Sequence, residues 1–260
     1  MSQIWNTVFF EPMLNALFLL YSLLGRNFGL AIIVFTVVVR LLTLPITLQQ
    51  MRQAKATQEI QPKIEELKKK YKGDQEKLGQ EQMKLYKEHG VNPLGCLLPT
   101  LIQFPIWIGM YQSIVNALPD NPVQMVNLSQ HLYHRFPHLS SLLPLNSSFL
   151  GLDLGRPFPV LAVFVALTMW VNQKMMATPS ADPQQQAMSQ SMELTMPLMF
   201  GLITSNVASG LGMYFVVTNV LQIVQQYYFT GWGGLAKLLN RPPAVPKSTK
   251  AKDRGNERKS

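Results

Sequence analysis

The chain has 260 residues, of which 47% are hydrophobic and only 14% are charged, whereas roughly 25% charged residues are typical of soluble domains. The apolar residues lie in blocks of about 20, the length that spans a bilayer, which excludes a large water-soluble core. The single cysteine, Cys96, excludes an intramolecular disulfide framework and Cys-rich zinc chemistry. The net charge of +9 favours phosphates, acidic peptide segments or anionic lipid as partners wherever it is concentrated.

The first 27 residues are predicted to form a segment of their own. Residues 4–24 are largely apolar, but Glu11 and Asn15 interrupt them, and the uninterrupted run at 16–24 is too short to span a bilayer. No basic n-region precedes the run and no A-x-A site follows it, which argues against a cleaved signal peptide. We therefore predict an amphipathic helix that lies in the outer membrane interface. A sixth span, which would invert the N-terminus, is the alternative.

Five apolar stretches follow, and each predicts a transmembrane helix. They lie at about 28–48, 95–117, 158–177, 194–209 and 211–230. The short step from Gly210 to Gly212 predicts a tight turn, so that the last two helices form an antiparallel hairpin. The predicted fold class is an all-α membrane protein with a five-transmembrane-helix core over residues 28–230.

The basic residues are strongly segregated. Of the 23 Lys and Arg, ten lie within residues 52–89 and eight within 237–260. Because five spans place both regions on one side, the positive-inside rule puts them in the cytoplasm, with the N-terminus and residues 118–157 outside. The tail, 231–260, is predicted to be a basic disordered segment that binds either ribosomal RNA phosphates or anionic lipid.

Residues 52–89 predict a cytoplasmic helical hairpin. Apolar residues recur with helical spacing at Ile60, Ile64, Leu67 and Tyr71, and again at Leu78, Leu85 and Tyr86. Between the two stripes, Gly73 predicts a helix stop and Asp74 an N-cap. The hairpin is either a solvated link between two spans or a mobile arm at the membrane surface.

Arg40 lies deep within the first predicted span, where an unpaired cation costs about 2.5 to 3.5 kcal/mol on insertion. One interpretation is that it snorkels to the headgroups, because the inner end at Leu48 is only 8 residues away. The other is a water-filled cavity inside the bundle, favoured by polar residues in the other spans. They are Gln103, Asn172, Gln173, Thr204, Ser205, Asn206, Thr218, Asn219 and Gln222.

Other chemistry is weakly indicated. The predicted spans contain no acidic residue in their interior, whereas a proton or cation pump normally places Asp or Glu there. His131, His134 and His138 have near-ligand spacing, but Pro137 interrupts any helix that would align them. With no catalytic motif visible, we expect neither an enzyme nor a cofactor, metal or small-molecule substrate. A small-anion channel or transporter that uses Arg40 as its binding charge is the rival function class.

Several motifs in combination resemble the YidC-type membrane protein insertases over roughly residues 28–230. They are Gly29-Leu-Ala-Ile-Ile-Val through Val39-Arg40-Leu-Leu-Thr-Leu-Pro45, Gln61-Pro62, the run from Lys84 to Pro99, Ile102-Gln103-Phe-Pro105-Ile, and Gly210-Leu-Gly-Met-Tyr214-Phe through Asn219 to Gln225-Gln226. Each piece alone is unspecific, but the combination is specific.

The resemblance implies a five-helix core with a groove that is open to the cytoplasm and to lipid and closed on the outer side. It implies that the arginine of the first core helix, here Arg40, attracts hydrophilic stretches of a nascent membrane protein. Apolar substrate segments would slide out along core helices 2 and 5, which adds Tyr214 and Phe215 to the predicted groove. The expected partners are nascent membrane proteins and the lipid bilayer of a bacterial cell membrane, with the Sec translocon and the ribosome as further candidates.

Overall fold

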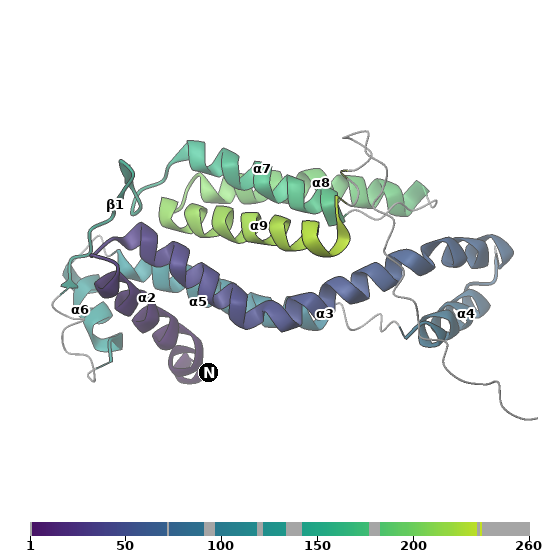
Figure 1. The fold of residues 1–260 in the computed structure, drawn as a ribbon, viewed down its shortest axis with the longest axis horizontal. Coiled ribbons are helices and arrows are strands. Elements are labelled where there is room, and N and C mark those ends of the chain that lie inside the picture. The colour runs from purple at the N-terminus through teal and green to yellow at the C-terminus, as the bar shows by residue number, and fades with distance from the viewer. Residues whose placement is uncertain are drawn as a thin grey trace, which may run out of the picture.

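The computed structural model describes residues 2–71, 73–90, 97–118, 122–133, 142–176, 183–232 and 235. Its helices are α1 (Ser2–Trp5), the π-helical turn η1 (Asn6–Phe10), α2 (Glu11–Leu23), α3 (Phe28–Lys70), α4 (Gln75–Glu88), α5 (Leu97–Ala117), α6 (Pro122–His131), α7 (Pro159–Met176), α8 (Pro183–Thr204) and α9 (Ser209–Thr230). A short antiparallel ribbon, β1 (Ser148–Phe149) and β2 (Leu152–Asp153), precedes α7. The predominantly helical fold confirms the predicted class in outline, and Figure 1 shows an elongated bundle from which α4 and the end of α3 project.

The N-terminal helical run, α1 through α2, packs against α3 and α5. Leu17 and Phe18 are completely buried in this contact. The amide of Asn15 bridges to the end of α6, since its Nδ2 donates to the carbonyl of His131 at 3.0 Å and its Oδ1 accepts from the N–H of Tyr133 at 2.8 Å. The segment is therefore helical, as predicted, and is part of the bundle core. Its place in a membrane interface stays a prediction.

Helix α3 is continuous over 43 residues, so the predicted first span and the first half of the predicted hairpin form one helix. It begins after Asn27, whose Oδ1 accepts from the N–H of Leu30 at 3.0 Å. Beyond its last turn, Gly73 has a positive φ of 124°, and Asp74 caps α4 by accepting from the N–H of Lys77 at 3.1 Å. The predicted helix stop and N-cap are confirmed.

The projecting part of α3 packs against α4 through a small apolar contact. Ile60 and Ile64 are only 2% and 4% exposed, and they pack against Leu85 and Tyr86. These are members of the two stripes that the sequence analysis identified. The two helices therefore form a hairpin, held by side-chain burial rather than by the connecting turn alone.

Helices α8 and α9 are consecutive and joined by a short turn, and each packs mainly along α7. They also meet through side chains, since the rings of Phe200 and Phe215 lie 5.6 Å apart.

The tight turn predicted at Gly210 and Gly212 was misplaced, because the turn occupies 205–208 and both glycines lie in the first turns of α9. A Cβ at Gly212 would lie 2.9 Å from Cγ2 of Thr204 and 3.0 Å from Cδ2 of Leu161. Close helix packing, not a turn, requires this glycine.

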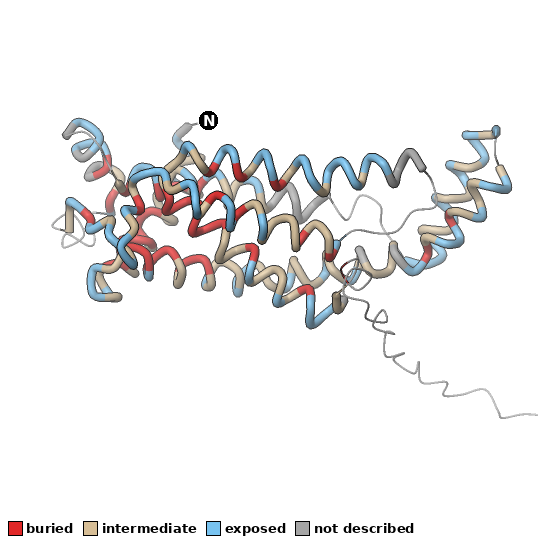
Figure 2. The backbone as a smooth tube through the Cα atoms, turned by 90° about the horizontal axis from the view of Figure 1, so that it is seen from above, coloured by how far each residue is buried: buried red, intermediate tan, exposed pale blue. Residues whose placement is uncertain are grey.

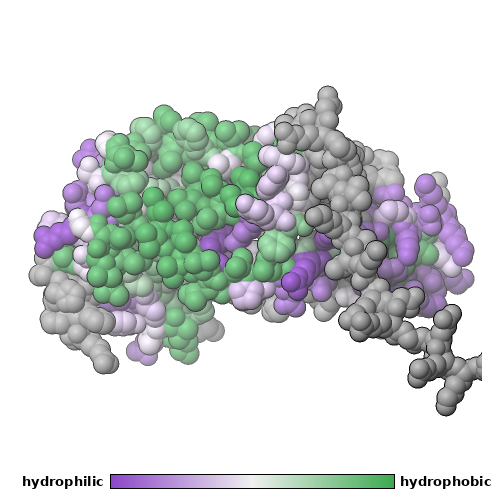
Figure 3. All heavy atoms as spheres, in the orientation of Figure 1, coloured by the Kyte–Doolittle hydropathy of each residue, from purple (hydrophilic) through white to green (hydrophobic). Residues whose placement is uncertain are grey.

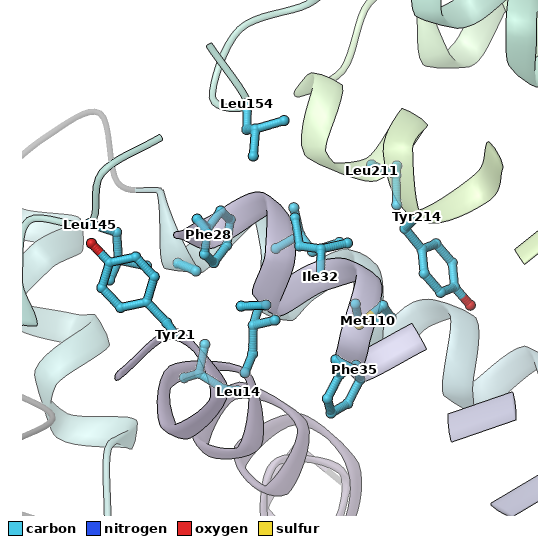
Figure 4. Close-up of a cluster of buried hydrophobic side chains, with 14 of the residues drawn as sticks. Leu14, Tyr21, Phe28, Ile32, Phe35, Met110, Leu145, Leu154, Leu211 and Tyr214 are labelled. Atoms are coloured by element: carbon cyan, nitrogen blue, oxygen red, sulfur yellow. The ribbon is translucent and has the colours of Figure 1, made fainter. Parts of the chain in front are cut away.

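The buried side chains gather at one end of the bundle, opposite the α3–α4 hairpin (Figure 2). Figure 4 shows the centre of this cluster, which includes Leu14, Tyr21, Phe28, Ile32, Phe35, Met110, Leu145, Leu154, Leu211 and Tyr214. They come from α2, α3, α5, α9 and the segment before α7. Dense apolar packing therefore closes this end of the bundle.

The β-ribbon segment also caps the beginning of α9. The N–H groups of Ser209 and Gly210 donate to the carbonyls of Arg156 and Leu154 at 3.0 and 2.9 Å, and the Ser209 hydroxyl donates to the carbonyl of Asp153 at 2.8 Å. The first N–H groups of a helix have no partner inside the helix. The ribbon segment supplies these partners and holds α9 in place at the closed end.

Gly29 of α3 provides a test of this closed end. A Cβ at Gly29 would overlap the ring of Phe149 on β1. Gly29→Ala should therefore lower the free energy of unfolding in detergent by about 1–3 kcal/mol, the usual cost of overpacking, and should expose residues 147–156 to protease.

The control is Gly79→Ala on α4, where a Cβ meets nothing within 4 Å. It should raise stability by about 0.5–1 kcal/mol because alanine favours a helix over glycine. In a Phe149→Ala background, Gly29→Ala should cost little. The same loss in both backgrounds would show that the Phe149 ring is not the cause.

Candidate functional site

A cavity of about 320 Å³ lies between α3, α5, α7, α8 and α9. Its lining consists of Arg40, Thr43, Ile46, Thr47 and Gln50 of α3, Gln103, Phe104 and Trp107 of α5, Met169 of α7, Phe200 of α8, and Tyr214, Phe215, Thr218, Asn219 and Gln222 of α9. Among these described lining residues, Arg40 alone is charged. The cavity thus combines one cation with neutral hydroxyls, amides and aromatic rings.

The cavity begins at the closed end of the bundle and extends toward the hairpin. Tyr214 and Phe215 belong both to its lining and to the buried cluster. From there the lining residues continue along α9 to Gln222 and along α3 from Arg40 to Gln50, in the direction in which α3 projects (Figure 1). The residues therefore describe a groove with an apolar floor and a polar outlet.

Arg40 is half-buried and reaches across the groove to α9. Its Nη2 donates to Oε1 of Gln222 at 3.1 Å and to the carbonyl of Thr218 at a longer 3.4 Å. Both acceptors are neutral, and no carboxylate pairs with Arg40 in the described part of the chain. The side chain therefore points into the bundle, and its positive charge is hydrogen-bonded without being neutralised.

A second polar network fixes α7 to α9 behind the groove. Asn172 is buried and its Nδ2 donates to the carbonyl of Asn219 at 3.2 Å. The Nδ2 of Asn219 in turn donates to the Thr168 hydroxyl at 3.2 Å. Because buried amides are costly unless hydrogen-bonded, this network favours one relative position of the two helices and so sets one wall of the groove.

Seven of the eleven predicted groove residues line the cavity: Arg40, Gln103, Tyr214, Phe215, Thr218, Asn219 and Gln222. Asn172 lies behind the lining, and Gln173 is half-buried outside it. The hydroxyl of Thr204 donates to the carbonyl of Phe200 within its own helix at 2.6 Å. Asn206 is exposed in the turn after α8, where its Nδ2 donates to the carbonyl of Leu202. These four are not brought into the cavity.

Two kinds of lining residue were not predicted from the sequence. Thr43, Thr47 and Gln50 follow Arg40 at spacings of 3, 4 and 3 residues, so helical periodicity already placed them on the same face of α3. For the lining residues Trp107 and Phe200, no sequence signal distinguishes an aromatic side chain that faces a groove from one that faces lipid.

The aromatic lining residues join three helices. The ring centroid of Trp107 on α5 lies 6.0 Å from those of both Phe200 on α8 and Phe215 on α9. Phe200 and Phe215 are 5.6 Å apart and meet edge to face. Such distances are those of favourable aromatic pairs. The three rings therefore form an apolar wall within the lining of the groove.

Helix α8 is longer than the span predicted at 194–209. It begins at Pro183, and this places Glu193, which lies just outside the predicted span, near the middle of the helix. The Oε2 of Glu193 lies 2.6 Å from Nζ of Lys174 on α7, and these side chains are only 13% and 26% exposed. Unlike Arg40, Glu193 is neutralised by a salt bridge.

Some predictions fall outside the described residues. The tail from 236 onward, Cys96, His134 and His138 are among these. Within the described part of the chain, no group of three or more His, Cys, Asp or Glu is placed to hold a metal ion.

The outer surface of the bundle is strongly apolar. Figure 3 shows a broad hydrophobic surface over the bundle and a hydrophilic one at the hairpin end. Exposed apolar residues include Val163, Phe164 and Leu167 of α7 and Leu198 and Leu202 of α8. Two described helices, Phe28–Thr57 and Pro159–Met176, are long and apolar enough to cross a membrane.

The chain is similar to several known membrane protein insertases. The chain is 34% identical over 230 residues to the membrane protein insertase YidC of Oceanobacillus iheyensis, covering 85% of this chain and 82% of that protein. It is 34% identical over 233 residues to the membrane protein insertase MisCA of Bacillus subtilis, covering 87% and 79%. A longer relative, the YidC of Geobacter sulfurreducens, is 33% identical over 224 residues, which are 86% of this chain but only 37% of that protein.

The chain also resembles a solved insertase structure and matches a protein family. A crystal structure of an active YidC insertase, with its first transmembrane domain resolved, superposes with a TM-score of 0.55 at 26% identity, and the match covers 84% of this chain and 45% of that one. Residues 19–233 match the family described as the 60Kd inner membrane protein. The chain therefore belongs to the 60Kd inner membrane protein family, whose members include the YidC and MisCA membrane insertases.

Proposed function

We propose that the chain is a non-enzymatic membrane protein insertase of a bacterial cell membrane. The observation that carries the proposal is Arg40, whose cation is held by the neutral groups of Thr218 and Gln222 inside the cavity. A charge that is hydrogen-bonded but not neutralised can attract an acidic or polar segment of another chain. The insertase names of the relatives point to the same function.

The mechanism is differential solvation. A polar peptide segment crossing a bilayer loses its hydration, and each unsatisfied backbone group costs several kcal/mol in hydrocarbon. The polar side of the groove offers hydroxyls, amides and the Arg40 guanidinium in place of water. The barrier for moving a short polar segment into the membrane would therefore fall without any covalent chemistry.

The apolar wall would serve the other part of the substrate. Trp107, Phe200 and Phe215 line the same cavity as Arg40. A nascent membrane helix presents apolar residues next to the polar segment that it must carry across. The groove would hold both at once, with the apolar residues leaving for lipid along α5 and α9.

The proposed membrane arrangement has five spans: the first half of α3, then α5, α7, α8 and α9. The exposed apolar residues of α7 and α8 support it. The closed end of the bundle would then face outside, and the α3–α4 hairpin and basic tail would lie in the cytoplasm, as the distribution of Lys and Arg indicates. The lipid bilayer, the Sec translocon and, through the tail, the ribosome are the proposed partners beside nascent chains.

Substitutions of Arg40 test the groove. Arg40→Ala should reduce insertion of a substrate with an acidic translocated tail on the order of tenfold or more, because a hydrogen bond to a charged group contributes about 1.5–3 kcal/mol. Arg40→Lys should keep much of the activity, since the positive charge matters more here than the planar, multiply donating geometry of the guanidinium. Insertion is measured into liposomes that contain purified protein.

Two controls accompany the Arg40 variants. A neutral-tail substrate should be affected less by Arg40→Ala, and Arg156→Ala, which removes an exposed arginine from the segment before α7, should insert both substrates normally. If Arg40→Ala inserts both substrates as well as the unaltered protein, attraction by charge is not the mechanism. Anion flux without any insertion would instead indicate a channel.

Protease digestion tests the topology. In right-side-out vesicles, external trypsin should spare the hairpin and the tail, which contain 18 of the 23 Lys and Arg. In inverted vesicles the same regions should be cut. Cleavage within residues 52–89 in sealed right-side-out vesicles would reverse the proposed orientation.

Replacement of the hairpin tests whether it only links two spans or also captures substrate. A flexible linker in place of residues 52–89, long enough to join α3 to α5, should lower insertion while the remaining helices still assemble. The matched variant Ile60→Asp, which keeps the chain length but disrupts the buried contact with α4, should also lower insertion. Unchanged insertion by both variants would mean that the hairpin only connects two spans.

A further inference from the structure

Helix α8 is held tightly in its second half. A Cβ at Gly201 would lie 3.1 Å from Cβ of Ala166 and 3.5 Å from the carbonyl oxygen of Ala162, so the backbones of α8 and α7 approach closely there. The ring of Phe200 lies against Trp107 and Phe215. This half of α8 therefore has fixed neighbours on α5, α7 and α9.

The first half of α8 has no buried residue within 187–196, whereas Pro197, Gly201 and Thr204 of the second half are buried. Met188, Met192 and Leu194 are 67%, 45% and 58% exposed. Glu193 is the only charged residue of the α8 sequence, and Lys174 is the only charged residue of α7. Their 2.6 Å ion pair is largely buried, and in such surroundings either charge left alone would be costly. We call Lys174 and Glu193 the latch pair.

A proline separates the two halves. Pro197 is buried within α8 and lies four residues after Glu193 and four before Gly201. Since proline has no N–H, the carbonyl of Glu193 lacks its usual helical hydrogen bond, and the ring crowds the preceding turn. A helix weakened at this position bends more easily than an unbroken one.

We propose that Pro197 is a hinge in α8 and that the latch pair positions the exposed first half of the helix against α7. Phe200, the α8 residue of the groove lining, lies three residues beyond the hinge on the fixed side. Since none of the described residues 187–196 lines the cavity, movement of the first half would change how α8 packs on α7 and leave the contacts of Phe200 with Trp107 and Phe215 in place. This inference rests on the proposed function, since it makes the latch pair control the position of a helix that borders the proposed groove.

The inference is tested by distances between paired spin labels in a Cys96→Ser background, with the full chain in lipid. One pair, at Met176 and Met188, reports on the latched half. The other, at Val163 and Leu202, reports on the fixed half. All four positions are exposed. The unaltered latch pair should give one narrow distance distribution for each label pair.

Three variants give distinct expected results. Lys174→Gln with Glu193→Gln leaves no unpaired charge, and it should broaden and lengthen only the 176–188 distances. The charge swap Lys174→Glu with Glu193→Lys should restore a narrow distribution. Adding Pro197→Ala to the neutral double variant should also narrow it, because the missing helical hydrogen bond is regained.

A 176–188 distribution that stays narrow in the neutral double variant would overturn the proposal. So would equal broadening of the 163–202 distances, because that would mean general loosening of α8. As a functional readout, Pro197→Ala alone should stabilise the protein in detergent yet lower insertion of a substrate with a bulky apolar segment. The spin-label distances are measured without substrate. The hinge proposal can therefore be contradicted while the insertase function is supported, and the insertase function can be contradicted while the hinge proposal is supported.

Discussion

A cation inside a membrane bundle must be solvated by something other than lipid, and this constraint at Arg40 governs the arrangement of the surrounding helices. The guanidinium reaches the carbonyl of Thr218 and the amide of Gln222 on α9, so α9 must lie beside α3. The position of α9 is in turn set by Asn172 of α7 and by the ribbon segment that caps Ser209. The groove is thus a consequence of how one charge is accommodated.

The closed end of the bundle blocks one end of the groove. Apolar packing there is continuous from α2 through α3 and α5 to α9, and the first N–H groups of α9 are satisfied by protein carbonyls rather than by water. In the proposed function, polar segments would therefore reach Arg40 from the hairpin side and not through the closed end. A cavity open at both ends would conduct ions, whereas one closed at an end can accept a segment of chain without a continuous pore.

The parts of the fold that were predictable follow from local chemistry. Gly73 favours the positive φ that ends α3, and Asp74 favours the N-cap position of α4, so both predict a break between the helices. The helical spacing of Ile60 and Ile64 predicts the face of α3 that α4 covers. Gly210 and Gly212 were misread because the same residue type serves both turns and close helix packing. Only the neighbouring helix, which the sequence does not place, distinguishes the two.

Arg40 and Lys174, both partly buried, show why the partner of a basic residue matters more than its charge. Lys174 meets a carboxylate at 2.6 Å, and the pair is neutral as a whole, so it can hold two helices together but has little attraction left for a third chain. Arg40 meets only an amide and a carbonyl oxygen, which lower the cost of burying the cation while leaving its field in place. An acid placed beside Arg40 would stabilise the bundle and abolish that field. In the proposed function, the neutral acceptors on α9 would therefore allow Arg40 to act on a substrate.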